Sequence, residues 1–263
     1  MTAPAGVVSP IESPIELVIF DCDGVLVDSE RICVKVDARI TAELGCAFTE
    51  AEIIEKFVGS SDEVYTAAVA ERLGRTLEEG WRLPYEHLYE EAFAAELTAV
   101  DGIGEILDRL TRSATPFCVA SNGRHQDIRR SFGLTSLARH FTDDRIFSAT
   151  DVPRGKPAPD LFLHAARSLG VAPERCVVVE DSPYGVQAAR AAGMRVLGYC
   201  GGLSRAARLE EAGAVVFDDM SALQGLLDIQ DLSDVPGALD IPGQSDAAGV
   251  RGASGLQRAA GQH

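Results

Sequence analysis

Long apolar runs and basic residues are both scarce in this chain of 263 residues. No apolar run reaches the roughly 18–20 residues that a membrane-spanning helix needs, so we expect no membrane partner. The first sixteen residues, MTAPAGVVSPIESPIE, contain no basic residue and no long apolar stretch, so a signal peptide is not expected either. The sequence therefore predicts a cytoplasmic protein.

Positive charge is outweighed by negative charge, with 24 Lys and Arg residues against 40 Asp and Glu residues and a formal net charge of −16. A protein this acidic repels phosphate backbones, so we expect no nucleic-acid partner. An anionic small-molecule substrate needs a metal ion or a local cationic pocket to approach it. The six cysteines are scattered without a CxxC pair, which predicts reduced thiols and no zinc site.

Apolar segments of strand length recur along the chain and alternate with amphipathic helical patterns. The helical patterns place Ile103, Ile106, Leu107 and Leu110 on one face. Such alternation predicts an α/β fold: a Rossmann-like core in three layers, with a parallel sheet between helices. The expected strands are 16–20, 116–120, 176–179, 195–199 and 214–217.

One interval lacks strand signals and predicts a separate helical domain. Between residues 31 and 97 the patterns are helical, and two segments, 49–52 and 60–63, have the spacing of a capping box at a helix start. We therefore expect a core made of residues 15–30 and 98–227, with a small helical cap domain at 31–97 inserted into it. Residues 1–14 are predicted to be flexible, and the glycine-rich segment 228–263 to be a disordered tail.

Acidic residues follow two of the predicted strands. Asp21 and Asp23 directly follow the first strand, and Glu180 and Asp181 follow the segment 176–179. Because ligands bind at the carboxyl edge of parallel sheets, paired carboxylates there suit a hard cation such as Mg²⁺. The residues alone leave other interpretations open: DxDG is also typical of a polar turn, and Asp181 or Ser182 also suits a helix N-cap.

Two further segments carry chemistry that suits a phosphate group. Ser121 and Asn122 follow the second predicted strand, where a hydroxyl, an amide and backbone N–H groups suit phosphate oxygens. Lys156 is one of three lysines in the chain and lies between Gly155 and Pro157. Taken singly, the first segment is also ordinary loop chemistry, and the second is also typical of a solvated surface lysine.

Taken together and in order, these segments resemble the haloacid dehalogenase (HAD) superfamily over about residues 15–225. Segment 20–30, FDCDGVLVDSE, is similar to its first motif, and segment 179–186, VEDSPYGV, to its last. The resemblance extends to its capped phosphatase and β-phosphoglucomutase-like members, and is greatest to sugar-phosphate and 6-phosphogluconate phosphatases. The helical interval then resembles the small cap domain of that family.

The resemblance implies a function and a set of roles. It implies a Mg²⁺-dependent phosphatase that hydrolyses a small phosphorylated metabolite, of the sugar phosphate or phosphogluconate type, through an aspartyl-phosphate. Asp21 is the implied nucleophile and Asp23 the implied acid and base. Ser121, Asn122 and Lys156 are implied to bind the transferring phosphate. The implied metal ligands are Asp21, the backbone carbonyl of Asp23, Glu180 and Asp181.

Alternatives to a phosphatase remain. Dehalogenases of the family lack the second acid, which is present here as Asp23. A β-phosphoglucomutase-type mutase needs cationic groups for a second phosphate, and the matching positions here are Cys33 and Asp62. A non-catalytic binding module is a further alternative, although the implied nucleophile and metal pair are both present. A monomer or a weak homo-oligomer is expected.

Overall fold

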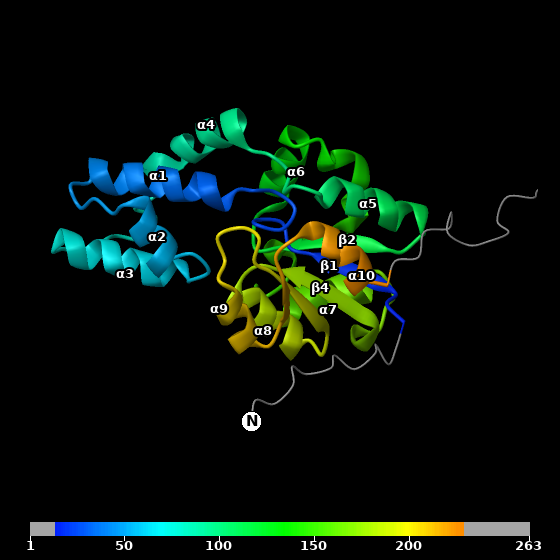
Figure 1. Cartoon of the computed structure of the whole chain (residues 1–263). Helices are drawn as coiled ribbons and strands as arrows, with labels where there is room; N and C mark the ends of the chain where they lie inside the picture. The colour runs from blue at the N-terminus through cyan, green and yellow to red at the C-terminus, as the bar shows by residue number, and fades with distance from the viewer. Residues whose placement is uncertain (1–13, 229–263) are drawn as a thin grey trace, which may run out of the picture. The chain divides into compact units, whose positions relative to one another are not determined.

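A computed structural model describes residues 14–228, and its centre is a parallel sheet of six strands in the order β3-β2-β1-β4-β5-β6. Helices cover both faces of this sheet (Figure 1), so the predicted Rossmann-like α/β core is confirmed. The strands are β1 (Leu17–Phe20), β2 (Phe117–Ser121), β3 (Ile146–Ser148), β4 (Cys176–Glu180), β5 (Arg195–Tyr199) and β6 (Val215–Phe217).

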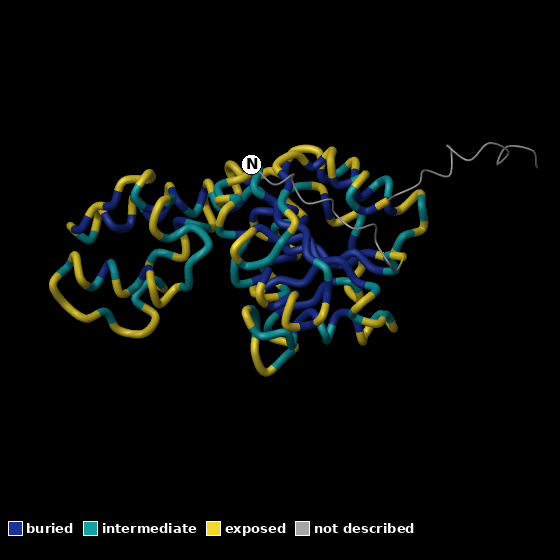
Figure 2. The backbone as a smooth tube through the Cα atoms, turned by 60° about the horizontal axis from the view of Figure 1, so that its bottom comes forward, coloured by how far each residue is buried: buried dark blue, intermediate teal, exposed yellow. Residues whose placement is uncertain are grey.

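Strand β1 lies at the centre of the sheet, buried on both faces. It pairs in parallel with β2, where Val18 is opposite Phe117, and with β4, where Leu17 is opposite Cys176. Side chains alternate between faces along a strand, so Val18 and Phe20 join one apolar cluster, and Leu17 and Ile19 join another. The strands form the buried interior in Figure 2, which explains their continuous apolar sequence.

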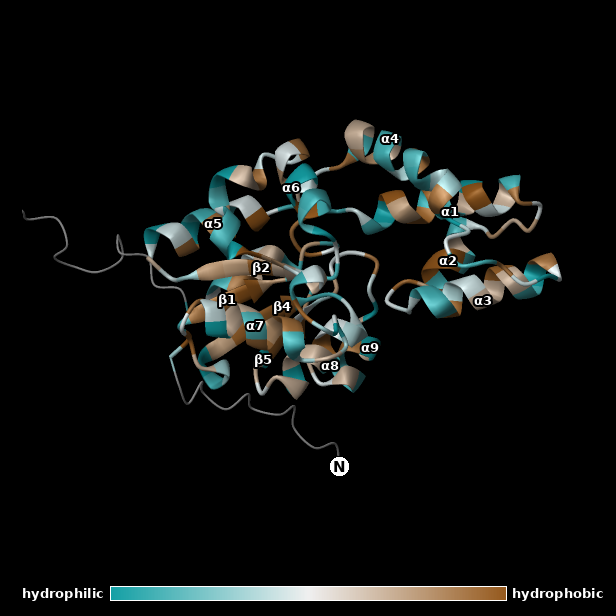
Figure 3. Cartoon of the chain, turned by 180° about the vertical axis from the view of Figure 1, so that it is seen from behind, coloured by the Kyte–Doolittle hydropathy of each residue, from teal (hydrophilic) through white to brown (hydrophobic). Residues whose placement is uncertain are grey.

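Each apolar cluster is completed by a layer of helices. The four residues predicted to share a helical face, Ile103, Ile106, Leu107 and Leu110, are all buried in the first cluster. The hydropathy colours show the same contrast between apolar strands and polar outer helix faces (Figure 3). Among the helices that follow residue 100, α5 (Ile103–Arg112), α6 (His125–Leu134) and α10 (Leu223–Leu226) contribute to the first cluster, and α7 (Asp160–Ser168), α8 (Pro183–Ala191) and α9 (Ala206–Ala212) contribute to the second.

The segment between β1 and β2 begins with four helices that pack together (Figure 1), and we call this part the helical insert. Its helices are α1 (Glu30–Glu43), α2 (Glu50–Lys56), α3 (Asp62–Leu73) and α4 (Glu86–Glu96), with a 3-10 turn at Leu83–Tyr85. Helices α1, α2 and α3 surround a small apolar cluster that includes Val34, Ile53 and Val69, whereas α4 packs in the first core cluster through Leu88. The domain boundaries at residues 31 and 97 stay a prediction.

The two chain crossings between the insert and the sheet lie side by side. The amide of Asp28 donates to the carbonyl of Thr98 at 3.0 Å, and the amide of Val100 donates to Leu26 at 3.0 Å. These hydrogen bonds fix where the insert leaves and rejoins the core. The first helix of the insert, α1, thus begins two residues after Asp28, close to the acidic segment that follows β1.

Local details depart from the sequence analysis in two places. Strand β3 was not among the predicted strands, because its three residues, Ile146, Phe147 and Ser148, are too few to show a pattern. The capping box expected at 60–63 is wrong: Ser61, not Ser60, is the N-cap of α3, and its side chain makes no cap hydrogen bond. The capping box between Thr49 and Glu52 is confirmed.

The predicted flexible N-terminus and disordered tail lie outside the described residues, apart from residues 14 and 228. Among the described helices, none is long and apolar enough to cross a membrane.

Candidate active site

The turn after β1 places Asp21 at the carboxyl edge of the sheet. The Asp21 amide donates to the Val179 carbonyl at 2.9 Å, which continues the pairing of β1 with β4 by one residue. The chain then turns through Gly24, whose φ of +79° favours glycine. The turn is closed by the Gly24 amide, which donates to Val27 at 2.8 Å.

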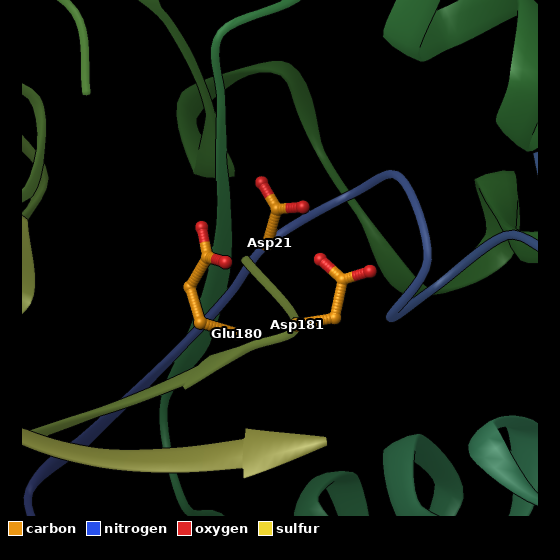
Figure 4. Close-up of side chains that lie close together, drawn as sticks. All are labelled: Asp21, Glu180 and Asp181. Atoms are coloured by element: carbon orange, nitrogen blue, oxygen red, sulfur yellow. The ribbon is translucent and has the colours of Figure 1, made fainter. Parts of the chain in front are cut away.

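Three carboxylates meet at this edge of the sheet. Asp21 comes from the end of β1, and Glu180 and Asp181 come from the end of β4 (Figure 4). One oxygen from each lies within 4.8 Å of the others, and all three residues are buried. The close pairing of the two central strands therefore creates a concentrated negative charge away from bulk water.

Lys156 reaches this cluster from the loop before α7. Its ammonium bonds to Asp21 Oδ1 and donates to Glu180 Oε1 at 2.7 Å, and its side chain is only 4% exposed. Burial opposes the charge on Lys156, but the two facing carboxylates raise its pKa overall. Burial raises the pKa of Asp21 to about 8 although Lys156 acts in the opposite direction. One ammonium therefore leaves the three carboxylates undercompensated.

Two glycines make room for the carboxylates. A Cβ on Gly185, in the first turn of α8, would lie 1.7 Å from Glu180 Oε1. A Cβ on Gly24 would lie 2.0 Å from Asp181 Oδ2. Glu180 is also held through Oε2, which accepts from the amide of Ser182 at 2.8 Å and from its hydroxyl at 2.9 Å. The segments around β1 and β4 thus fit these side chains closely.

Asp23 does not belong to the three-carboxylate cluster, and unlike those three residues it is exposed. Its Oδ1 accepts from the Ser29 hydroxyl at 2.7 Å. The surrounding protein raises its pKa by desolvation, while the Ser29 hydrogen bond lowers it. Its backbone carbonyl as a metal ligand stays a prediction.

Ser121 and Asn122 end β2 beside the cluster and serve partly as structural links. The buried Ser121 hydroxyl accepts from the Gly123 amide at 3.0 Å. The Asn122 side chain donates to the Lys156 carbonyl at 3.1 Å and accepts from the Lys156 amide at 2.9 Å. Asn122 therefore positions the lysine loop, a role that its sequence context does not indicate.

A pocket of about 520 Å³, which we call the central pocket, joins these groups. Its walls come from the core and from residues 59–63 of the insert, which are the end of the loop before α3 and the first two residues of α3. Every residue predicted for the site lines it: Asp21, Asp23, Ser121, Asn122, Lys156, Glu180 and Asp181. The structure thus brings all seven together, and their individual roles stay predictions.

Arg82 is a further polar residue near the site that the sequence patterns do not indicate. It lines a neighbouring pocket of about 360 Å³, the insert pocket, which also contains Asp23 and Cys33. The guanidinium donates to Asp62 Oδ1 at 2.6 Å and to Asp37 Oδ1 at 2.9 Å, and it lies 4.3 Å from the centre of the Tyr65 ring. No motif surrounds Arg82 in the sequence, so only the packing of the insert helices reveals its position.

Comparisons with known proteins identify the family. The family model described as haloacid dehalogenase-like hydrolase matches residues 18–199. A 6-phosphogluconate phosphatase of Escherichia coli is 36% identical over 192 residues, covering 72% of this chain and 84% of the relative. Hexitol phosphatase A of the same organism is 32% identical over 190 residues, covering 68% and 80%.

A solved structure extends the likeness to the fold. A haloacid dehalogenase-like protein of Agrobacterium tumefaciens superposes with a TM-score of 0.73 at 36% identity, covering 81% of this chain and 98% of that one. The chain therefore belongs to the haloacid dehalogenase-like hydrolase family, which confirms the predicted class of enzyme, a hydrolase of phosphoric monoesters.

Proposed function

We propose that the protein is a Mg²⁺-dependent phosphatase that acts on a small phosphorylated metabolite of the sugar phosphate or phosphogluconate type. The observation that carries this proposal is the meeting of Asp21, Asp23, Lys156 and the Glu180–Asp181 pair in one pocket. The two phosphatase relatives support the substrate class. A monomer or weak homo-oligomer is the accompanying expectation.

The donor set of the central pocket fits Mg²⁺. Three buried carboxylates supply oxygen ligands close together, and Lys156 is the basic residue among the described residues lining the pocket. Asp21, Glu180 and Asp181 would hold the ion, with the backbone carbonyl of Asp23 as a further ligand. When bound, the ion offsets the charge of the phosphoryl group and of the carboxylates.

Phosphoryl transfer to Asp21 is the proposed first step. Lys156 bonds to Oδ1 of Asp21, so Oδ2 is the proposed attacking atom. A bond forms from Oδ2 to phosphorus as the bond from phosphorus to the ester oxygen breaks, and the carboxyl group of Asp23 gives its proton to that oxygen. The products of this step are the free alcohol and an aspartyl-phosphate.

Hydrolysis of the aspartyl-phosphate completes the cycle. The carboxylate of Asp23 takes a proton from water, whose oxygen attacks phosphorus and releases inorganic phosphate and Asp21. Ser121 and Asn122 are proposed to bind phosphoryl oxygens, and Lys156 to neutralise charge beside the nucleophile. For Asn122, binding through the side chain requires exchange of its present bonds to Lys156.

The helical insert is proposed to act as the cap over this site. Its residues 59–63 already form one wall of the central pocket. Closure of this wall excludes water while the phosphoryl group is transferred. A phosphatase then readmits water for the second step.

A mutase is the alternative activity, and the insert pocket bears on it. A mutase holds a bisphosphate at both ends, and Cys33 and Asp62 stand where cationic groups are implied by the resemblance. Both line the insert pocket, and Asp62 faces Arg82. Conversion of β-glucose 1-phosphate to glucose 6-phosphate without release of phosphate would replace the hydrolase assignment.

The proposed roles predict a specific difference between Asp21→Asn and Asp23→Asn. With p-nitrophenyl phosphate and Mg²⁺, D21N should release no nitrophenolate above background. D23N should release a burst of about one nitrophenolate per active site and then turn over slowly, because this leaving group needs no proton but hydrolysis of the intermediate needs a base. On glucose 6-phosphate, D23N should lose roughly 10²–10⁴-fold in kcat.

Asp28→Asn is the matched control, because Asp28 belongs to the same segment but bonds to Arg31 at 3.0 Å. It should retain both activities. Steady turnover by D21N, or full turnover of glucose 6-phosphate by D23N, would contradict the proposed chemistry.

A further inference from the structure

Asp23 lies where three pockets meet, which limits where the rest of a substrate can lie. It lines the central pocket, the insert pocket, and a third pocket of about 250 Å³ between α4 and α6, which we call the outer pocket. If Asp23 protonates the leaving oxygen, the remainder of the substrate extends into the insert pocket or the outer pocket. The lining of those two pockets therefore determines which substrates are accepted.

Carboxylates outnumber basic groups in the insert pocket. Four carboxylates line it, from Asp23, Glu30, Asp37 and Asp62, against the single guanidinium of Arg82. Arg82 donates to both Asp37 and Asp62. Its charge is thus already matched within the pocket, so it offers little net attraction to an anion.

The outer pocket has the same character. Its basic residues are Arg124 and Arg130, and each is paired with an acidic residue of the same lining. Arg124 donates to Asp127 at 2.7 Å, and Arg130 donates to Glu90 at 2.9 Å. Glu86 and Asp23 add further negative charge. Among the described lining residues of both pockets, every basic group faces a carboxylate partner.

Three buried polar atoms of residues lining the insert pocket lack a hydrogen-bond partner within the described chain. They are Oε2 of Glu30, the hydroxyl of Tyr65 and Nε of Arg82. An ionised carboxylate oxygen accepts hydrogen bonds, a guanidinium N–H donates them, and a phenol does both. Hydroxyl groups of a ligand both donate and accept, so they satisfy all three atoms, whereas a second carboxylate or phosphate offers the ionised Glu30 oxygen no donor. Buried polar groups of this kind are expected to find partners.

We propose that the enzyme selects phosphate monoesters whose other end is uncharged and rich in hydroxyl groups, such as sugar and sugar-alcohol phosphates, and discriminates against a second anionic group. This inference rests on the proposed phosphatase function and narrows its substrate class. The inferred substrate differs from 6-phosphogluconate, the substrate named for one relative, because 6-phosphogluconate carries a carboxylate. It is closer to a hexitol phosphate, the kind of substrate named for hexitol phosphatase A.

Sorbitol 6-phosphate and 6-phosphogluconate provide the decisive comparison, because they differ at the end remote from the phosphate. With Mg²⁺ at neutral pH, kcat/KM for sorbitol 6-phosphate should exceed that for 6-phosphogluconate by about tenfold or more, since like charges repel in a partly desolvated pocket. Fructose 6-phosphate should likewise be preferred over fructose 1,6-bisphosphate. Equal kcat/KM values, or a preference for either ester that carries a second anionic group, would overturn the inference.

Asp62→Lys tests whether the insert pocket sets this preference. Asp62 is 66% exposed, so its replacement is compatible with folding, and the new ammonium reverses the charge beside Arg82. The ratio of kcat/KM for 6-phosphogluconate to that for sorbitol 6-phosphate should rise about tenfold. Glu71→Lys makes the same charge change on α3 at an exposed position outside the three pockets, and should leave the ratio unchanged.

The outcomes separate this inference from the proposed function. If none of the four esters is hydrolysed, the phosphatase proposal fails. If they are hydrolysed but the wild-type ratio favours the anionic partner, or D62K and E71K shift the ratio equally, the phosphatase proposal stands and the assignment of specificity to the insert pocket fails.

Discussion

Gly185 allows the carboxylate of Glu180 to lie close to the backbone of α8. Its backbone lies against Glu180, where a Cβ would fall 1.7 Å from Oε1. Gly185→Ala should therefore displace the carboxylate and raise the Mg²⁺ concentration needed for half-maximal activity by roughly 10–100-fold, the range found when groups that orient ligands are removed. Titration of activity against Mg²⁺ measures this shift.

Gly104→Ala is the matched control. Gly104 also lies in the first turn of a helix, α5, but no atom lies within 4 Å of its added Cβ. The substitution should leave the Mg²⁺ requirement unchanged and, because alanine favours helix over glycine, should not lower stability. Similar Mg²⁺ requirements for both variants would show that crowding at Glu180 does not matter.

The site residues were predictable where they follow a recognisable strand, because the carboxyl ends of parallel strands lie at one edge of the sheet. Asp21, Ser121 and Glu180 each end or follow an apolar segment, and parallel strands bring such ends together. The bonds of Asn122 to Lys156 and the position of Arg82 depend on how loops and insert helices pack. No sequence period records such contacts between distant segments, so these features required the structure.

Helix α9 links the core to the insert through one side chain. Arg208 donates to the Val58 carbonyl at 3.1 Å and to the Glu55 carbonyl at 3.3 Å, just before the residues 59–63 that wall the central pocket. Arg208→Ala removes both charged hydrogen bonds, so loop 57–61 should open more readily. We expect faster amide hydrogen exchange in that loop and about a tenfold or greater loss in kcat/KM, since a hydrogen bond from a charged group contributes about 1.5–3 kcal/mol net and about 1.4 kcal/mol corresponds to tenfold.

Arg167→Ala on α7 serves as the comparison for Arg208→Ala, because Arg167 is exposed and lies outside the pockets at the site. It should change neither exchange in loop 57–61 nor kcat/KM. Unaltered exchange in the Arg208 variant would show that the contact does not restrain the loop.

Elements were predictable when they were long or strongly patterned. Helix α5 shows its buried face in the sequence through residues such as Ile106 and Leu110. Strand β3 has three residues and is stabilised by pairing with β2, where Val119 is opposite Ile146. Such a short strand forms because β2 offers it backbone hydrogen-bonding partners. Its own three residues are too few to show the apolar pattern that predicts a strand.

The whole molecule should be stabilised by the ion that its site is proposed to hold. Three buried carboxylates share one ammonium, so a bound cation relieves repulsion in the folded state alone. At a Mg²⁺ concentration 100 times its Kd, the free energy of unfolding should rise by about 2.7 kcal/mol. That corresponds to a Tm increase of roughly 5–10 °C, measurable by calorimetry against the chelated protein.

Asp181→Asn should reduce this Tm increase, whereas Asp143→Asn, an exposed acid in an ion pair with Arg129, should keep it. An equal increase in both variants would mean that Mg²⁺ stabilises the protein elsewhere. The readout is independent of turnover, so it tests the metal site even if the substrate class is wrong.

The central position of β1 also has a consequence for biosynthesis. Among the described strands β1 is synthesised first, yet its partners are β2, through Val18 and Phe117, and β4, through Leu17 and Cys176. Loops of such length close slowly, and domains fold as their partners emerge during synthesis. Asp21, the proposed nucleophile at the end of β1, thus acquires Glu180 and Asp181 as neighbours only after β4 has been synthesised, so the site cannot assemble before that point of translation.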